Sequence, residues 1–572
     1  MDYVRDSQLG HLVRAITRNK VLLWPEELPG FQFQPIIEAS TSEKVNEREA
    51  SDANDPEIGK VQNTGAQNDN DNDDDQQDQL PIERVATRVG TSQADAEINL
   101  AKLGTNAADV ILMDWYGEED VDNPLNWPMR KKLFTTFVIC LYTFVVYCGS
   151  AIFVPSFGFL MYRFDVSEVV SSLGLALYVV GYAMGPMIFS PLSEIAMIGR
   201  NPPYVISFIL FFVVSIITAV VDNFAALMVL RFLQGFFGSP CLASGGASLQ
   251  DIYSWSQVPY GFIVWVAAMY CGPALGPLLS GYAVSSNWHW PLWEMVIMAG
   301  PFMILLIAFL PETSRSTILL HRAQRIRNVT GNPNIRAASE IKKIKMADIV
   351  VDALIKPTEI AIKDPAITFV CIYSALVYAI YYSFFEAFPI VYHGFYGMTL
   401  GEIGLIFLSI IIGCLIATAM YAAYLYFIFM PRSQKVAPTQ ESRLLPALIA
   451  VWVLPAGLFL FAWTSRESIH WIAPTIGVSI YAGSSFIIFQ CIIAYVPLTY
   501  PDYVASLFAA NDFIRSMTAA GFVMFSRSMY VNLGIGKGVS LLAGLSVMGI
   551  IGMYFLFYFG ATLRARSKFA AS

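Results

Sequence analysis

The chain has 572 residues, of which 55% are hydrophobic and only 14% are charged. Soluble domains carry about 25% charged residues, so this composition excludes an ordinary soluble globular protein. The formal net charge of −8 arises in residues 1–129, where acidic residues far outnumber basic ones, because residues 130–572 are mildly basic. An acidic polar segment therefore precedes an apolar body.

Residues 1–129 are expected to be an acidic, largely disordered cytoplasmic tail. Residues 40–110 are poor in aromatic side chains and rich in Asn, Asp and Gln, a composition that cannot bury enough apolar surface to fold. Within residues 4–24, one helical face collects four apolar side chains: Leu9, Leu12, Val13 and Ile16. This face predicts a short helix on the inner membrane surface. A polar tail with some helical tendency is the alternative.

Twelve apolar segments follow, and each is long enough to cross a bilayer as a helix. They lie near 133–155, 169–192, 203–222, 224–246, 258–283, 291–310, 366–391, 402–430, 444–463, 469–496, 504–526 and 538–560. The third and fourth are almost contiguous, which predicts a tight hairpin. The predicted fold is an all-α membrane protein of twelve transmembrane helices.

The charged, partly helical segment 314–365 divides the spans six and six. This pattern is typical of a transporter with two pseudo-symmetric halves, here 130–313 and 366–560, followed by a short tail at 561–572. Lysine and arginine concentrate on one side of the expected membrane, and 314–365 carries many of them. The positive-inside rule therefore places both termini and this linker in the cytoplasm.

The loop after the second span contains Glu194, Gly199 and Arg200. An acid at this position can hold the N-terminus of a helix from the other half, and Arg200 can pair with Asp251 at the end of the fourth span. These four residues predict a conformational latch that forms in one state and releases in another. A positive-inside loop with an ordinary turn is the alternative.

Arg231 lies inside the fourth apolar segment, in the string Arg231-Phe-Leu-Gln234-Gly235. A charge at membrane depth is costly and usually faces a polar interior where it has a function. Its guanidinium stays charged and can bias the pKa of a neighbouring acid or hold backbone carbonyls. We therefore expect a proton-coupling residue, with a purely structural arginine as the alternative.

In the fifth span, small residues recur at intervals of four: Ala268, Gly272, Gly276 and Ser280. Such a face lets two helices approach closely in lipid. Pro273 and Pro277 follow two of these residues and are expected to bend the helix. A generic packing face is the alternative to a functional motif.

Together these strings resemble the major facilitator superfamily. The loop resembles the signature between spans 2 and 3, although Asn201-Pro202 stands where a second arginine is common. Arg231 and its neighbours resemble the span-4 signature of proton-driven members. Gly272-Pro273 with Gly276-Pro277 resembles the antiporter signature, which seals the interface between the halves.

Further strings narrow the resemblance to the fungal drug:proton antiporters with twelve spans, and among these to yeast resistance pumps for fluconazole, benomyl and methotrexate. They are Trp115-Tyr-Gly-Glu-Glu-Asp120, Asn123-Pro124-Leu-Asn126-Trp127-Pro128, Leu310-Pro311-Glu312-Thr313 and Tyr381-Tyr-Ser-Phe-Phe-Glu386. The sequence departs from that family at His289, where arginine is usual.

The facing spans are expected to supply a substrate pocket from these residues: Trp265, Tyr378, Tyr381, Tyr382, Phe385, Gln490, Phe508, Asn511 and Arg515. An aromatic wall with few polar groups suits varied apolar drugs, although any single aromatic ring could instead pack against core or lipid. Glu386 and Asp512 join Arg231 as proton-coupling candidates. Two alternatives to proton coupling stay open: Glu386 lines the mouth of the pocket and does no more, and Asp512 and Arg515 simply neutralise each other.

The resemblance implies a monomeric transporter, not an enzyme, that exports diverse drugs, including azole antifungals, across the plasma membrane by proton antiport and alternating access. The sequence holds no phosphate-binding loop and no Cys/His cluster, so we expect no cofactor, metal or nucleic-acid partner. Two alternatives stay open. The same fold could export a polyamine or an endogenous toxic metabolite, or the protein could be a sensor that does not transport.

Overall fold

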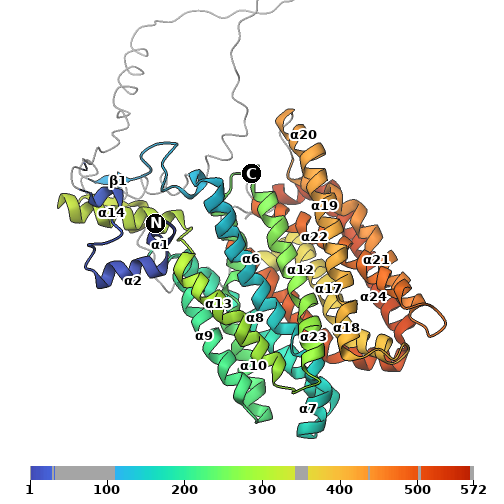
Figure 1. Cartoon of the computed structure of the whole chain (residues 1–572). Helices are drawn as coiled ribbons and strands as arrows, with labels where there is room; N and C mark the ends of the chain where they lie inside the picture. Colours follow the sequence, from blue (N-terminus) through green and yellow to red (C-terminus); the bar gives the residue numbers. More distant parts are fainter. Residues whose placement is uncertain are drawn as a thin grey trace, which may run out of the picture.

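The computed structural model describes residues 2–28, 31, 110–341, 359–435, 439–499 and 504–566. Its long helices run side by side in one bundle (Figure 1). The short helices α1 (Asp2–Arg5), α14 (Arg315–Thr330) and α20 (Met430–Lys435) lie at one end, which we call the α14 end. Helix α7 (Phe157–Phe164) lies at the other end, which we call the α7 end.

The first half of the bundle, the N-half, contains six spans. They are α6 (Met129–Ala151), α8 (Glu168–Glu194), α9 (Asn201–Val220), α10 with α11 (Phe224–Gly238 and Pro240–Ile252), α12 (Val258–Ala283) and α13 (Trp290–Phe309). Helix α11 begins at Pro240, whose missing N–H is tolerated at a first helical position. The tight hairpin predicted between the third and fourth spans is confirmed, since α9 ends at Val220 and Asn223 caps α10 by accepting from the Ala226 N–H at 3.0 Å.

The second half, the C-half, also contains six spans. They are α17 (Pro365–Phe388), α18 with α19 (Leu400–Ile406 and Leu408–Tyr424), α21 (Leu445–Thr464), α22 (Ile472–Thr499), α23 (Val504–Leu533) and α24 (Ile535–Arg566). Asp364 caps α17 by accepting from the Ala366 N–H at 3.0 Å. The halves meet where α8 and α11 pack on α23, and where α12 packs on α18, α19 and α22.

Eleven helical stretches of the described residues are long and apolar enough to cross a membrane. Helix α23 is the twelfth span of the predicted plan but is absent from these eleven, because its sequence carries Asn511, Asp512 and Arg515. It packs against α8 and α17, so those polar side chains lie between helices instead of facing lipid. The predicted two-half, twelve-helix fold is confirmed.

Both ends of residues 1–129 have regular structure, within the range that the sequence predicts to be largely disordered. Near its start, α1 and α2 (Gln8–Ile16) pack on the N-half, and the short helix η1 (Pro25–Glu27) packs on α14. Near its end, β1 (Ile111–Met113) pairs in parallel with β2 (Ile335–Ala337), which follows α14. Residues 40–109, the core of the disorder prediction, lie outside the described residues.

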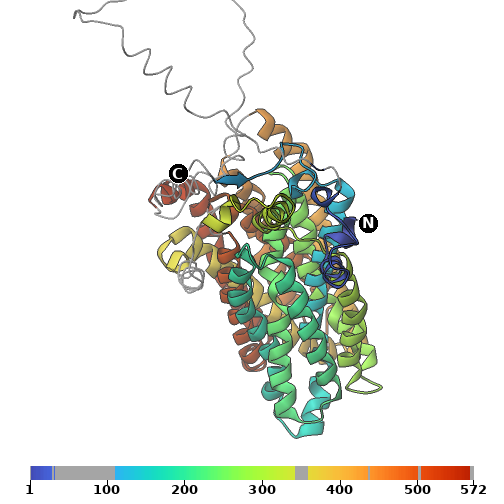
Figure 2. The same ribbon diagram turned by 90° about the vertical axis from the view of Figure 1, so that its left-hand side faces the viewer.

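The N-terminal helices cover one flank of the α14 end. Figure 1 places them, in dark blue, on the side of the bundle away from the orange and red C-half. Figure 2, turned by 90°, shows α2 nearly end-on. The two views together show that α2 lies across the direction of the spans.

Candidate functional site

A cluster of buried polar side chains lies where the two halves meet. We call it the central cluster and define it by Tyr147 and Tyr182 of the N-half and Tyr378, Tyr382, Asp512 and Arg515 of the C-half. Four helices, α6, α8, α17 and α23, supply its members. Because it takes groups from both halves, any motion of one half against the other must rearrange it.

Arg515 joins the halves at this cluster. Its guanidinium forms an ion pair with Asp512 one helical turn earlier on α23. It also donates to the Tyr147 hydroxyl at 3.0 Å and contacts the Met269 sulfur at 3.2 Å, and both of these residues belong to the N-half. Its Cζ lies 4.6 Å from the centre of the Tyr378 ring, a cation–π distance. Both members of the ion pair therefore belong to α23, and Tyr147 and Met269 of the N-half contact it across the interface.

The tyrosine hydroxyls of the cluster bond to one another. The Tyr182 hydroxyl lies 3.0 Å from that of Tyr378 and donates to that of Tyr382 at 2.9 Å, so both bonds cross between the halves. Ser150 Oγ lies 3.2 Å from the Tyr382 hydroxyl and adds a further contact from α6. Tyr147 and Tyr182 escaped the sequence analysis because nothing in their local strings distinguishes them from core tyrosines.

The predicted pocket residues divide into two groups. One group lies at the boundary between the halves: Trp265, Tyr378, Tyr381, Tyr382, Phe508 and Arg515. Trp265 packs across it against Phe508, with ring centres 6.5 Å apart. The other group stays within the C-half, where Asn511 donates to Ser374 at 2.8 Å and Phe385 packs on Phe407. Gln490 is buried, and its amide finds no hydrogen-bond partner among the described residues.

The rings of the boundary group are buried and packed against one another in this conformer. A cavity of about 20 Å³ remains beside Phe508 and Asn511, between α17, α22 and α23. A larger cavity of about 570 Å³ opens at the α14 end, lined by Ser256, Gln257, Tyr260, Tyr426, Phe427, Met430, Pro431 and Gln434. A drug-sized molecule at the central cluster would therefore require the halves to separate.

The sequence pattern of the Major Facilitator Superfamily matches residues 139–520. The chain belongs to the major facilitator superfamily. It is 46% identical to the MFS-type transporter pyvG of Aspergillus violaceofuscus, over 81% of this chain and 86% of that protein. It is 37% identical to fluconazole resistance protein 1 of Saccharomyces cerevisiae, over 84% of this chain and 88% of that protein.

Among solved structures, the proton:xylose symporter XylE superposes with a TM-score of 0.55, at 14% identity, over 76% of this chain and 96% of that one. This likeness concerns the fold alone. The chain is thus a multi-pass membrane transporter of the facilitator superfamily, not an enzyme, and fungal drug-resistance proteins are among its relatives.

In this facilitator, Arg231 is completely buried and bonds to backbone carbonyls. It donates to Gly174 from Nε and to Gly149 and Ser150 from its terminal nitrogens, each at 3.1 Å. Its remaining hydrogen bond is to Gln234 Oε1 at 3.2 Å, and no acid is among the partners found in the described residues. The sequence analysis expected Arg231 either to shift the pKa of a neighbouring acid or to bind backbone carbonyls, and in this structure it binds backbone carbonyls. Since Ser150 also contacts Tyr382, Arg231 supports the end of α6 beside the central cluster.

Glu386 lies apart from the other proton-coupling candidates. Its carboxylate is buried, 3.9 Å from Arg527, which in turn pairs with Glu168 at 2.5 Å. Glu168 begins α8 in the N-half, whereas Arg527 and Glu386 belong to the C-half. This triad bridges the halves near the α7 end. The sequence analysis missed Arg527 and Glu168, which stand in segments with no recognisable motif.

The predicted latch residues are only partly as expected. Arg200 pairs with Asp251 at 2.5 Å, but both belong to the N-half. Glu194 is exposed at the end of α8. The acid that receives backbone N–H groups at a helix start is instead Glu312, which accepts from Arg200 and Asn201 at 3.1 Å and from Ser314 at 2.8 Å. This contact lies within one half, whereas the predicted latch was to hold the other half through Glu194.

The position next to Glu312 that Gly199 occupies requires a glycine. Its φ of +78° is in the left-handed region, and a Cβ there would collide with the Glu312 carboxylate. Burial raises the pKa of Glu312, although the N–H groups that it accepts oppose that shift. The string Leu310-Pro311-Glu312-Thr313 was noted in the sequence, yet nothing in it indicated a helix cap.

The small-residue face of α12 also differs from the expectation. A Cβ on Gly272 would come within 2.9 Å of the Phe144 carbonyl oxygen, and one on Gly276 within 2.7 Å of the Ile152 nitrogen. Phe144 belongs to α6 and Ile152 caps its C-terminus, so in this conformer Gly272 and Gly276 join two helices of the N-half instead of sealing the halves. The seal runs along another side of α12, where Pro277 meets Gly404 and Gly281 meets Leu400.

Proposed function

We propose that this facilitator exports structurally diverse, mostly apolar drugs, azole antifungals among them, across the plasma membrane in exchange for protons. It would act as a monomer by alternating access, with the α14 end in the cytoplasm as the positive-inside rule expects. The name of the fluconazole-resistance relative supports this substrate class. So do the aromatic rings at the boundary, which demand little fixed hydrogen-bond geometry.

The observation that carries the proposal is the buried pair of Asp512 and Arg515. Asp512 keeps one carboxylate oxygen without a hydrogen-bond partner among the described residues, so it can take a proton. The arginine cannot give up its charge. A proton on Asp512 would leave Arg515 attracted to the N-half through Tyr147. Breaking a buried pair costs about 3–5 kcal/mol, so protonation and rearrangement of the halves would be coupled.

The same pair argues against the polyamine alternative. A polycation needs free carboxylates to replace its hydration, whereas the acid of the central cluster is already neutralised by an arginine. Arg231, which holds the end of α6 beside the cluster, would position groups for the coupled motion. Glu386 remains a candidate for a second proton site at the α7 end.

The test is uphill drug transport by the purified protein in liposomes with an imposed pH gradient. Labelled fluconazole should accumulate against its gradient, and a protonophore should abolish the accumulation. Asp512→Asn should still bind the drug but lose uphill transport by at least tenfold. The exposed Glu467→Gln is the matched control and should transport normally.

Wild-type uphill transport by Asp512→Asn would contradict the assignment of the proton site. Transport of fluconazole unaffected by either pH gradient or protonophore would contradict proton coupling itself. Uptake of spermidine in place of fluconazole would favour the polyamine alternative.

A further inference from the structure

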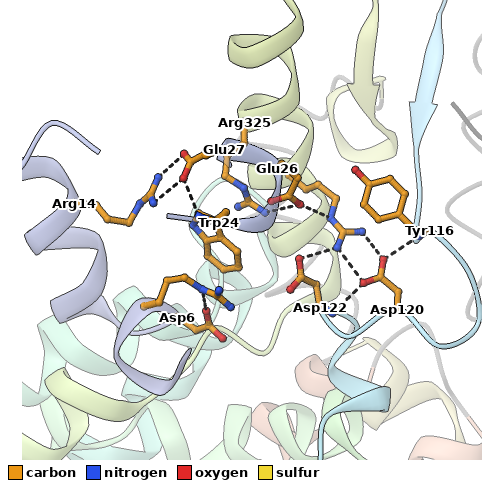
Figure 3. Close-up of polar contacts among 11 residues, drawn as sticks. Asp6, Arg14, Trp24, Glu26, Glu27, Tyr116, Asp120, Asp122 and Arg325 are labelled. Atoms are coloured by element: carbon orange, nitrogen blue, oxygen red, sulfur yellow. Dashed lines mark hydrogen bonds and ion pairs between the residues drawn. The ribbon is translucent and has the colours of Figure 1, made fainter. Parts of the chain in front are cut away.

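Residues 2–28 form a compact unit, which we call the N-terminal strap. Ser7 caps α2 by accepting from the Gly10 N–H at 3.3 Å. Arg14 then closes the strap on itself, because its two terminal nitrogens donate to the Glu27 carboxylate at 2.8 and 2.6 Å (Figure 3). It also donates to the Leu22 carbonyl at 2.7 Å. Bidentate pairs of this kind fix both distance and orientation.

The strap is fastened to the body by further charged contacts. Trp24 lies between two guanidinium groups, 4.3 Å from Arg5 and 4.1 Å from Arg325 of α14. The buried Glu26 lies 3.3 Å from Arg322 and 3.5 Å from Arg325 (Figure 3). At the other end of the strap, Asp6 pairs with Lys131 at 2.6 Å.

Arg322 holds a second segment as well. It donates to Asp120 at 2.6 Å and to Asp122 at 2.7 Å, so α14 binds both the strap and the chain that leads into α6 (Figure 3). These contacts engage the charged side chains on the side of the strap that faces the body. They fix the position of α2 relative to the N-half.

The opposite side of α2 is largely exposed. Leu12 is 58% exposed and Ile16 is 73% exposed. They are four residues apart and therefore share one face of the helix, while Gly10 and Arg14 are buried on another. Directly after the helix, Arg18 and Lys20 are exposed. An apolar face is thus followed by two basic side chains.

The position of α2 indicates what covers this face. It packs against α9 and α13 where these spans reach the α14 end, and it lies across them (Figures 1 and 2). Near that end, α9 exposes Ile206 and Leu210, and α13 exposes Phe309. In a membrane transporter such residues face lipid, so Leu12 and Ile16 extend a lipid-facing surface to the edge of the bilayer.

We propose that the N-terminal strap is a membrane-contact element that binds the leaflet at the α14 end. Leu12 and Ile16 enter the boundary between headgroups and acyl chains, and Arg18 and Lys20 bind anionic headgroups. Apolar side chains beside basic ones are typical of helices that lie in this interface. Each basic side chain near a negatively charged surface adds attraction that a zwitterionic surface does not provide.

The test measures the depth of single spin labels on the full-length protein in lipid nanodiscs. Labels go on Leu12→Cys and Ile16→Cys, with Asn334→Cys, an exposed position beyond α14, as the matched control. The seven native cysteines are buried or half-buried and compete little for the label. Accessibility to oxygen, which concentrates in the bilayer, is compared with accessibility to a water-soluble nickel chelate.

We expect the ratio of oxygen to nickel accessibility to be several-fold higher at positions 12 and 16 than at 334. Anionic lipid should raise it further than zwitterionic lipid does. In the double variant Arg18→Gln, Lys20→Gln, the effect of anionic lipid should disappear, while the difference from position 334 in zwitterionic lipid persists.

Two results would overturn the proposal. One is water-accessible labels at 12 and 16 in both lipids. The other is protection only in nanodiscs that hold two copies, which would assign the face to a second copy of the chain. Neither readout depends on the transported substrate or on protons.

Discussion

At the scale of single residues, the burial of Arg231 puts a permanent charge among backbone carbonyls, the Gln234 amide oxygen and the rings of Phe153 and Tyr178. Three carbonyls and one amide oxygen take its donors. The planar guanidinium reaches them from several directions at once, which the single ammonium of lysine cannot do. Replacing Arg231 by lysine keeps the charge but loses the planar geometry, so it separates the two contributions.

We predict that Arg231→Ala loses uphill export and about 3 kcal/mol of stability, because the carbonyls of Gly149, Ser150 and Gly174 lose buried donors. Arg231→Lys should keep the charge but recover only part of the export. Drug binding, proton-driven efflux and thermal unfolding are measured on matched samples. Full efflux by the alanine variant at wild-type abundance would show that the residue supports neither coupling nor the end of α6.

At the scale of helices, the two sides of α12 predict different phenotypes. Gly272→Leu or Gly276→Leu would push α12 away from α6 inside the N-half, where the backbone leaves no room. Both variants should lose stability by more than about 2 kcal/mol, as overpacked cores do, and export should fall with them.

Gly404→Leu acts on the other side, since its Cβ would meet the Pro277 carbonyl across the halves. It should leave each half folded but favour separation of the halves, so accessibility of the interface should change before thermal stability does. Gly300→Leu is the control, because only the Phe212 ring is nearby. Equal stability losses at 272 and 300 would refute the close contact of α12 with α6.

The strap predicts a pH dependence of its own. The His11 and His321 rings, 6.0 Å apart, face each other between α2 and α14. Burial lowers the pKa of both rings, followed by the charge of Arg14 for His11 and by His11 and then Arg325 for His321, whose pKa falls to about 4. Asp6 opposes this for His11. Since the unfolded pKa is 6.5, attachment is complete above pH 6.5 and is lost as pH falls toward 4, by at most about 3 kcal/mol for His321.

Limited proteolysis of the strap at a series of pH values checks this prediction. Cleavage within residues 2–28 should increase between pH 6.5 and pH 5 in the wild type. His321→Gln should flatten that dependence. Cleavage that is constant over this range in the wild type would count against the buried, neutral histidines.

Local pattern predicted most of the helices, because a span is defined by its own length and apolarity. Helix α12 covers 258–283, as predicted. Contacts between distant segments were not predictable in this way. No local signal tells which acid Arg527 meets, that Glu312 caps α9, or that Gly272 faces α6. In the strap, the helical periodicity of residues 8–16 was visible, but its ion pairs with α14 depend on partners far along the chain.

At the scale of the whole molecule, the ion pair of Arg527 and Glu168 holds the halves together at the α7 end in this conformer. An alternating-access cycle must break it when the transporter opens at that end. We therefore predict that Glu168→Gln increases the population open at the α7 end several-fold. Labelling of a cysteine introduced at Ser172, which is buried close to Met524 of the other half, measures this population.

The charge reversal Glu168→Arg with Arg527→Glu should restore the wild-type labelling rate, and Glu402→Gln, an exposed acid of the C-half, should not alter it. Unchanged labelling in Glu168→Gln would mean that the pair does not bias the conformational equilibrium.

The strap also has a consequence for how the chain is made. It leaves the ribosome before the spans do, yet Arg322 and Arg325, which hold Glu26, are translated about 300 residues later. At roughly 5–20 residues per second, that interval is on the order of 15–60 s. The strap must wait until all six helices of the N-half have been inserted, and its docking can then report that this half is complete.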